Sequence, residues 1–211
     1  MMVLLKDLWA DNKMAKLYFY YSAMNAGKST MLLQSNYNYI ERGMSTLIFS
    51  PSIDTRYGTG VVGSRIGLEA KAFSFDPDFD FLEFTKEKQK LDNNLSCVFI
   101  DEAQFLKKRQ VLQLCDIADK LKIPVLAYGL RSDFKGEPFE GSLNLLVWAD
   151  KLLEIKTVCF CGKKAINNAR IDAAGNIIKD GSQIMIGDNL NYTSMCRKHF
   201  TEAMFENVEV L

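Results

Sequence analysis

The turn between an apolar run and a helix-like segment near the N-terminus constrains the fold more than any other feature. Residues 18–33 read YFYYSAMNAGKSTMLL, in which the aromatic run stops at Ser22 and Gly27-Lys28-Ser29-Thr30 open the next segment. A continuous apolar run of this length is typical of a buried strand, and the segment that follows the turn has the spacing of a helix. The sequence therefore predicts a strand–turn–helix unit, which is the building block of an α/β fold.

The residues of this turn approach the phosphate-binding pattern GxxxxGK[ST]. Gly27, Lys28 and Ser29 fit the pattern, while Ser22 replaces its first glycine. Backbone N–H groups of such a turn, at the start of a helix, bind phosphate oxygens. Lys28 would reach the β- and γ-phosphates of ATP, and the Ser29 hydroxyl would bind Mg²⁺. The alternative is a chance Gly-Lys-Ser at a helix start. The predicted loop comprises Ser22, Ala23, Met24, Asn25, Ala26, Gly27, Lys28 and Ser29.

Further apolar runs alternate with helix-like segments as far as residue 157. Strands are predicted at Lys16–Tyr21, Thr46–Ser50, Lys71–Phe75, Cys97–Ile100, Pro124–Tyr128 and Lys151–Thr157, and helices at 29–42, 76–91, 107–121 and 143–149. In the first helix, Leu33, Tyr37 and Ile40 recur at helical spacing, so we expect them to face the core. Residues 54–67, with four glycines, are predicted to form a loop. This alternation predicts a P-loop, RecA-like α/β fold, in which helices cover both faces of a parallel sheet.

Two carboxylates follow the apolar strand Cys97–Ile100. Ligands of open α/β sheets bind beyond the carboxyl ends of the strands, so Asp101 suits a magnesium site. Adjacent strand residues point to opposite faces, so Glu102 would point to the acceptor substrate and take a proton from its hydroxyl as a general base. Gln104, in the same segment, is assigned to the nucleotide site. The alternative is an ordinary acidic strand end that faces solvent.

Three of the five cysteines gather late in the chain. Cys159 and Cys161 form a CxC pair, and Cys196 and His199 form a CxxH pair. Three thiolates and one imidazole complete a tetrahedral zinc set with no open position, which predicts a structural metal. The alternative is a set of buried free thiols. Between the two pairs, residues 169–187 are predicted to form a β-hairpin.

These features divide the chain into three predicted parts. Residues 1–14 are an extension that we expect to be loosely ordered, 15–157 form the P-loop nucleotide-binding domain, and 158–211 form a small zinc-binding domain that carries the hairpin. The other two cysteines, Cys97 and Cys115, lie in apolar runs, and we expect them to be buried as small hydrophobic residues.

The composition of the 211-residue chain argues against several classes of partner. Lys and Arg together number 26, as do Asp and Glu, so the net charge is zero. A balanced charge gives no electrostatic footprint for nucleic acid or an anionic membrane. No apolar run approaches the ~20 residues of a membrane span, and the N-terminal segment lacks the apolar core of a secretory signal. We expect a cytoplasmic protein without a nucleic-acid or membrane partner.

Four stretches together resemble the cellular, type II thymidine kinases, and the bacterial members with a CxC zinc pair are the most similar. These are SAMNAGKS, DEAQF at 101–105, GLRSDFKGEPF at 129–139 and the late CxC…CxxH, and the resemblance extends over residues 15 to about 203. It implies transfer of the ATP γ-phosphate to the 5′-hydroxyl of thymidine or deoxyuridine, for nucleoside salvage, with Glu102 as catalytic base. It also implies that Asp54 and Arg56 lie near the magnesium ion, the sugar and the phosphates.

The same resemblance implies a nucleoside pocket closed by the hairpin segment, which the family calls the lasso. Thymine would be bound largely by main-chain groups around Met185–Gly187, and Asn168 stands where some members have a threonine at the base. A homotetramer and feedback inhibition by thymidine triphosphate (dTTP) are further implications. The implied substrate-binding residues are Met24, Asp54, Phe105, Leu130, Phe134, Phe139, Met185, Ile186, Gly187 and Tyr192.

Two other functions remain open from the residues alone. The stretch Asp101-Glu102-Ala103-Gln104 looks like the DExQ box of a P-loop ATPase or helicase, although a helicase normally needs two such domains and a basic track. A zinc module that binds nucleic acid is the other alternative, because basic residues cluster in the late segment. These are Lys163, Lys164, Arg170, Arg197 and Lys198.

Overall fold

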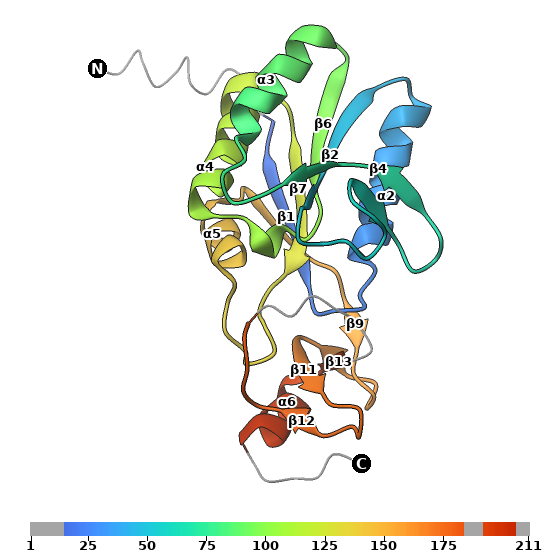
Figure 1. Ribbon diagram of the computed structural model, residues 1–211, viewed down its shortest axis with the longest axis vertical. Coiled ribbons are helices and arrows are strands. Elements are labelled where there is room, and N and C mark those ends of the chain that lie inside the picture. The colour runs from blue at the N-terminus through green and yellow to red at the C-terminus, as the bar shows by residue number, and fades with distance from the viewer. Residues whose placement is uncertain (1–14, 184–191, 206–211) are drawn as a thin grey trace, which may run out of the picture.

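The structure, a computed structural model, describes residues 15–183 and 192–205, and its centre is a six-stranded, fully parallel sheet (Figure 1). The strand order is β5-β2-β6-β7-β1-β8. The strands are β1 (Leu17–Ser22), β2 (Ser45–Pro51), β5 (Phe73–Phe75), β6 (Leu95–Ile100), β7 (Val125–Leu130) and β8 (Lys151–Glu154). The predicted parallel sheet is confirmed, and β1, which leads into the phosphate loop, lies between β7 and β8.

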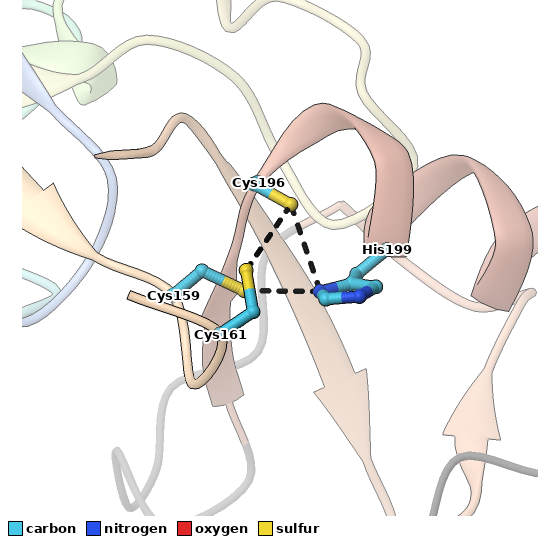
Figure 2. A group of neighbouring side chains, drawn as sticks. All are labelled: Cys159, Cys161, Cys196 and His199. Carbon is cyan, nitrogen blue, oxygen red and sulfur yellow. Dashed lines mark hydrogen bonds between the residues drawn. The ribbon is translucent and has the colours of Figure 1, made fainter. Parts of the chain in front are cut away.

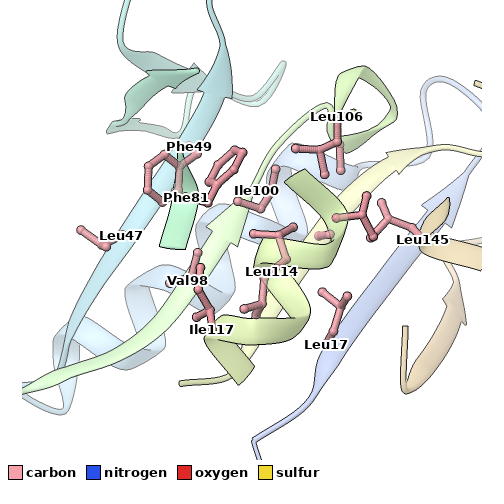
Figure 3. Close-up of a cluster of buried hydrophobic side chains, with 14 of the residues drawn as sticks. Leu17, Leu47, Phe49, Phe81, Val98, Ile100, Leu106, Leu114, Ile117 and Leu145 are labelled. Carbon is pink, nitrogen blue, oxygen red and sulfur yellow. The ribbon is translucent and has the colours of Figure 1, made fainter. Parts of the chain in front are cut away.

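Helices cover both faces of this sheet, as the sequence predicts (Figure 1). On one face lie α3 (Phe81–Leu91), α4 (Lys108–Asp116) and α5 (Glu140–Trp148), and on the other lies α2 (Lys28–Glu41). Residues of β6 alternate between the two cores: Val98 and Ile100 pack with Leu114 of α4, whereas Phe99 packs on the α2 side (Figure 3). A strand buried on both faces must be apolar at every position, which is why these strands appear as continuous apolar runs.

The buried face of α2 differs from the prediction. Leu33 is buried as expected, but Tyr37 and Ile40 are 58% and 54% exposed. The helix instead buries Leu32, Leu33 and Asn36. Asn36 accepts a hydrogen bond of 2.5 Å from Thr46 of β2, so a polar residue occupies a position that a search for apolar spacing passes over.

Several element boundaries also differ from the prediction. The helix predicted at 76–91 begins only at Phe81, because the Asp80 side chain accepts a bond from the Glu83 N–H and caps it. The helix predicted at 107–121 divides into α4 and a π-helical turn, η2 (Ile117–Leu121). The predicted loop at 54–67 contains β3 (Val61–Gly63), which pairs with β4 (Glu69–Lys71). Cys97 is buried as predicted, but Cys115 is only partly buried.

A small second assembly follows β8, at the bottom of Figure 1. It has its own buried cluster, which includes Ala169, Met195 and Phe200. The hairpin predicted at 169–187 is present in its described part, where β11 pairs antiparallel with β12, and β11 also pairs with β13. The division of the chain at residues 157 and 158 stays a prediction. Its elements are β9 (Thr157–Val158), β10 (Lys164–Ala165), β11 (Asn167–Ile171), β12 (Ile177–Ile178), β13 (Tyr192–Met195) and α6 (Arg197–Phe205).

No helix within 15–183 and 192–205 has the length and apolar character needed to cross a membrane.

Gly141, near the start of α5, marks the closest approach between that helix and the segment after the acid pair. A Cβ at this position would lie 2.4 Å from the Ala103 carbonyl oxygen and 2.8 Å from that of Gln104. Gly141→Ala would gain up to ~1 kcal/mol in helix propensity, but it would force two backbones apart. We expect a net loss of about 1–3 kcal/mol in the free energy of unfolding, measured by urea titration.

The matched control is Val147→Ala, on the exposed side of the same helix. It should change the free energy of unfolding by no more than ~0.5 kcal/mol. If Gly141→Ala were as stable as the parent chain, the close approach of α5 to this segment would not constrain the fold.

Candidate active site

The phosphate loop follows β1 and leads into α2 through two left-handed residues. Asn25 has φ 59° and Gly27 has φ 82°. Glycine adopts this conformation without a steric penalty, and asparagine is among the residues that tolerate it best. The carbonyl oxygen of Gly27 accepts the first helical bond, from the Met31 N–H at 2.9 Å. Because left-handed residues break the regular backbone pattern here, the loop can turn several N–H groups toward one point beyond the sheet.

Lys28 lies across the loop rather than in solvent. Its side chain is buried, and Nζ donates to Ser22 Oγ and to the Ala23 carbonyl oxygen, each at 3.2 Å. Burial lowers the pKa of Lys28, and the carboxylates of Glu102 and Asp101 partly oppose that shift. The ammonium group therefore ties the end of β1 to the start of α2, with the two acids close enough to influence its charge.

Asp101 lies at the end of β6 and is only 3% exposed. The hydroxyl of Ser29 donates to its Oδ2 at 3.1 Å, so the phosphate loop and the acid pair are in direct contact. Burial, and then repulsion from Glu102, raise the pKa of Asp101 to about 7. A hydroxyl and a carboxylate brought together at this edge are the oxygen ligands that Mg²⁺ prefers.

Glu102 leaves the strand with a left-handed backbone, φ 47°. This conformation is uncommon for a residue with a side chain, and such strain concentrates at functional sites. Two groups hold the carboxylate: Arg56 forms an ion pair with Oε1, and Gln104 Nε2 donates to Oε2 at 2.5 Å. Gln104 in turn accepts a bond from the Leu130 N–H at 3.0 Å. The carboxylate orientation is therefore fixed from two sides.

Arg56 connects the two acids that the sequence places near the substrate. Its Nε donates to Asp54 Oδ1 at 2.8 Å, and its Nη2 bonds both Asp54 Oδ2, at 2.6 Å, and Glu102. The bonds that Arg56 donates to Asp54 raise the pKa of Arg56, although burial opposes them, and the charge of Glu102 raises it further. The structure thus brings Asp54, Arg56 and Glu102 together from the ends of β2 and β6.

Part of the site described above opens onto a pocket of about 250 Å³. Most of the predicted phosphate loop lines it, as do Arg56, Glu102 and Leu130. The lining residues that the sequence reasoning missed are Thr30, Tyr57, Gly63, Ser64, Arg65 and Ile66. A Cβ on Gly63 would lie 2.4 Å from the Tyr57 ring, so only glycine at this position leaves room for that ring. The four glycines of residues 54–67 were the available signal in the sequence that backbone and side chains pack closely in this loop.

The predicted aromatic residues occupy the adjoining region rather than the lining of this pocket. Phe105 and Phe139 meet edge to face with ring centroids 6.0 Å apart. Phe134 is 1% exposed, and the guanidinium of Arg170 lies 3.8 Å from its ring centroid. Arg170 also donates to the Tyr192 hydroxyl, at 2.7 Å. Phe134, Arg170 and Tyr192 therefore form one contact cluster. Met185, Ile186 and Gly187 lie outside the described residues.

Cys159, Cys161, Cys196 and His199 converge in the small assembly (Figure 2). Their ligand atoms all lie within 4.8 Å of one another. Sγ of Cys161 and Cys196 are 3.9 Å apart, and His199 Nδ1 lies 3.4 Å from Cys159 Sγ and 3.6 Å from Cys196 Sγ. Tetrahedral bonds of about 2.3 Å to sulfur and 2.1 Å to nitrogen require separations of about 3.6–3.8 Å. The cluster therefore fits a four-coordinate metal.

The chemistry of one thiol agrees with this geometry. Burial opposes ionisation of Cys159, but the Cys161 backbone N–H and the His199 ring outweigh it and lower the pKa of the Cys159 thiol to about 6. A thiolate is the form that binds a metal. The Phe160 ring stacks on His199 with centroids 4.4 Å apart and restrains the imidazole plane.

Asp101→Asn is expected to stabilise the chain at neutral and alkaline pH. Because the pKa of Asp101 is raised to about 7, the stability of its neutral form is complete below about pH 4 and is lost as the pH rises through about 7. An amide cannot ionise. The free energy of unfolding of the variant should therefore exceed that of the parent by a margin that grows between pH 5 and 8, to about 1–3 kcal/mol.

Urea titrations at both pH values measure this margin. Asp119→Asn, on the exposed surface, is the matched control and should give no such pH-dependent gain. A constant difference between Asp101→Asn and the parent chain at pH 5 and pH 8 would contradict the assignment of a neutral, buried carboxyl.

Comparison with known proteins agrees with these features. The sequence family described as thymidine kinase matches residues 15–200 of the chain. A thymidine kinase from Rhodopirellula baltica is 57% identical over 196 residues, which cover 93% of this chain and 92% of that protein. One from Legionella pneumophila is 57% identical over 187 residues, with 89% and 90% covered. One from Shewanella oneidensis is 56% identical over 193 residues, with 92% and 100% covered.

A solved structure of the Pif1 helicase from Candida albicans matches 73% of this chain and 38% of that protein, at 16% identity and a TM-score of 0.40, a likeness too low to carry an argument. The family match and the relatives, by contrast, extend over most of the chain. This chain belongs to the thymidine kinase family.

Proposed function

We propose that this chain transfers the γ-phosphate of ATP to the 5′-hydroxyl of thymidine, and also of deoxyuridine. The observation that carries the proposal is that Lys28, Ser29 and Glu102 line one pocket and that Ser29 bonds to Asp101, in a chain of the thymidine kinase family. Phosphoryl transfer needs positive charge at the transferring group and a base at the attacking hydroxyl, and these groups supply both.

The phosphate loop would bind the triphosphate. N–H groups of residues 23–29 would surround the β- and γ-phosphates, helped by the N-terminus of α2. The ammonium group of Lys28, which lies across the loop, would neutralise negative charge that develops during transfer. Ser29 and Asp101 would bind Mg²⁺, which supplies further charge neutralisation, and Gln104 is assigned to the same nucleotide site.

Glu102 is the proposed general base. Its left-handed backbone and its bonds to Arg56 and Gln104 hold one orientation, so little ordering is needed when the acceptor binds. Arg56 bridges Glu102 and Asp54 and lines the same pocket, so its guanidinium would add positive charge near the phosphates.

The nucleoside would lie beyond Glu102, between Met24 and Leu130 and toward the aromatic region. The residues proposed to bind it are Met24, Asp54, Phe105, Leu130, Phe134, Phe139, Met185, Ile186, Gly187 and Tyr192. Closure of the lasso over the base would exclude water, so that ATP is not simply hydrolysed.

The remaining proposals rest on the family resemblance. Residues 15–157 are proposed as the catalytic domain and 158–211 as a zinc-binding lasso domain, with Zn²⁺ in the tetrahedral cluster. Cytoplasmic location, a homotetramer and feedback inhibition by thymidine triphosphate complete the proposal.

Substrate class is tested by transfer of labelled γ-phosphate from ATP to five nucleosides: thymidine, deoxyuridine, deoxycytidine, deoxyadenosine and deoxyguanosine. We expect product with thymidine and deoxyuridine alone. ATP hydrolysis that DNA stimulates, without a labelled nucleotide product, would contradict the proposal and favour the ATPase alternative.

Glu102→Gln tests the base. The amide keeps the size and can still accept a bond from Arg56, but it cannot take a proton, so kcat should fall about 100-fold or more. The KM for ATP should stay within about threefold of the parent value, because the phosphate loop is unchanged. The matched control is Glu87→Gln on the exposed surface of α3, which should be fully active. A near-normal kcat for Glu102→Gln would remove Glu102 from the mechanism.

Metal analysis tests the zinc cluster. We expect about one zinc per chain in the parent protein, because all four ligands come from the chain. Cys196→Ser should lose that metal and on the order of 3 kcal/mol of stability, because the small assembly buries few large apolar residues. Cys115→Ser, in α4, is the matched control and should retain the metal. Full zinc content in Cys196→Ser would contradict the assignment.

A further inference from the structure

Two side chains of the small assembly, Asn168 and Ser194, form hydrogen bonds to one residue of the phosphate loop, Met24. We call these two bonds the grip. The Met24 N–H donates to Asn168 Oδ1 at 2.7 Å, and Ser194 Oγ donates to the Met24 carbonyl oxygen at 2.7 Å. These two bonds fix the peptide groups on both sides of Met24. The next residue is Asn25, with φ 59°, so the grip sets the entry into the left-handed turn that orients the loop N–H groups.

The two gripping residues are a matched pair. Asn168 of β11 and Ser194 of β13 stand directly opposite each other in the antiparallel register. Opposite residues point to the same face of a sheet, so both side chains reach the loop from one surface. Asn168 is 2% exposed, and a buried amide oxygen that loses its partner costs about 1–3 kcal/mol. The buried Asn168 side chain therefore depends on its bond from the Met24 N–H.

The next pair on the same face is Arg170 and Tyr192. Strand residues two apart share a face, so this pair lies beside Asn168 and Ser194. Arg170 covers Phe134 and donates to the Tyr192 hydroxyl, and Phe134 and Tyr192 are two of the residues proposed to bind the nucleoside. One face of a small sheet thus carries the grip on the phosphate loop and part of the proposed nucleoside region.

We propose that Asn168 and Ser194 are positioning residues that couple the nucleoside region to the ATP site through the Met24 peptide groups. The inference rests on the proposed function, because it assigns the two regions to nucleoside and ATP. A nucleoside that orders the strands at Arg170 and Tyr192 also orders Asn168 and Ser194, and so favours the ATP-binding form of the loop. Linkage requires the reciprocal effect, in which ATP strengthens nucleoside binding by the same factor.

The test compares Ser194→Ala and Asn168→Leu with the parent chain. Each removes one bond to Met24. We expect the KM for ATP at saturating thymidine to rise about three- to tenfold, the value of one lost hydrogen bond. By linkage, the KM for thymidine at saturating ATP should rise by a similar factor, while the Kd for thymidine without nucleotide changes less than twofold. Ser194→Thr keeps the hydroxyl and should recover most of the ATP affinity. The matched control is Thr193→Val, on the opposite face of β13, which should behave as the parent.

A second measurement reads the coupling directly. Calorimetry gives the Kd of a non-hydrolysable ATP analogue with Mg²⁺, with and without thymidine. In the parent chain thymidine should tighten that Kd severalfold, and in Asn168→Leu or Ser194→Ala the enhancement should approach one. Thermal unfolding of each variant confirms that the protein measured is folded, and Ser194→Ala, at a partly exposed position, tolerates the change even if Asn168→Leu does not.

An unchanged KM for ATP in folded Ser194→Ala, or weaker binding of thymidine in the absence of nucleotide, would overturn the positioning role. The absence of any thymidine effect on the analogue in the parent chain would overturn the coupling. Failure of the proposed function looks different: the parent chain would bind the analogue but phosphorylate no thymidine. The analogue affinities of the variants without nucleoside would still show whether the grip positions the loop.

Discussion

Parallel strand pairing is the constraint on which the site depends. β1 pairs with β7, β7 with β6, and β6 with β2, all in the same direction. Their carboxyl ends therefore meet at one edge, where the phosphate loop, Arg56, Asp101 and Leu130 leave the sheet. The bond from Ser29 to Asp101 joins two segments that are 72 residues apart in the chain and separated by β7 in the sheet. No local sequence feature could bring these groups together without that sheet.

Several groups at this edge of the sheet lower the stability of the folded chain. Lys28 and Asp101 are buried, Asp101 has a raised pKa, and Glu102 has a strained backbone. The raised pKa of Asp101 and the strained backbone of Glu102 each destabilise the folded chain by an amount of the order of 1–3 kcal/mol. They persist because the buried apolar clusters on both faces of the sheet, one of which is drawn in Figure 3, fix the backbone around them. In the proposed reaction, the charges of the nucleotide and of Mg²⁺ would offset the cost of burying Lys28 and Asp101.

The sequence predicted the features whose signal is local. Continuous apolar runs predicted the strands, and the residue types of the late CxC and CxxH pairs predicted the cluster that the structure brings together. The prediction of the buried face of α2 was wrong because Asn36, a polar residue, lies on that face and bonds to Thr46. Tyr57 and Arg65 were missed as pocket lining because a glycine-rich loop has no periodicity to interpret. The bond between Asn168 and Met24 spans 144 residues, a distance at which one sequence carries no pairing signal.

The small assembly contacts the phosphate loop through two of its strands. β13 ends at Met195, directly before the metal-ligand candidate Cys196, and β11 begins six residues after Cys161. The cluster thus anchors one end of each strand that carries a grip on Met24. Because this assembly has only a small buried core, a metal bound by the cluster would add to the direct pairing of β11 with β13 in limiting their relative movement. We therefore expect the Cys159, Cys161, Cys196 and His199 cluster to influence the geometry of the phosphate loop through the two bonds to Met24.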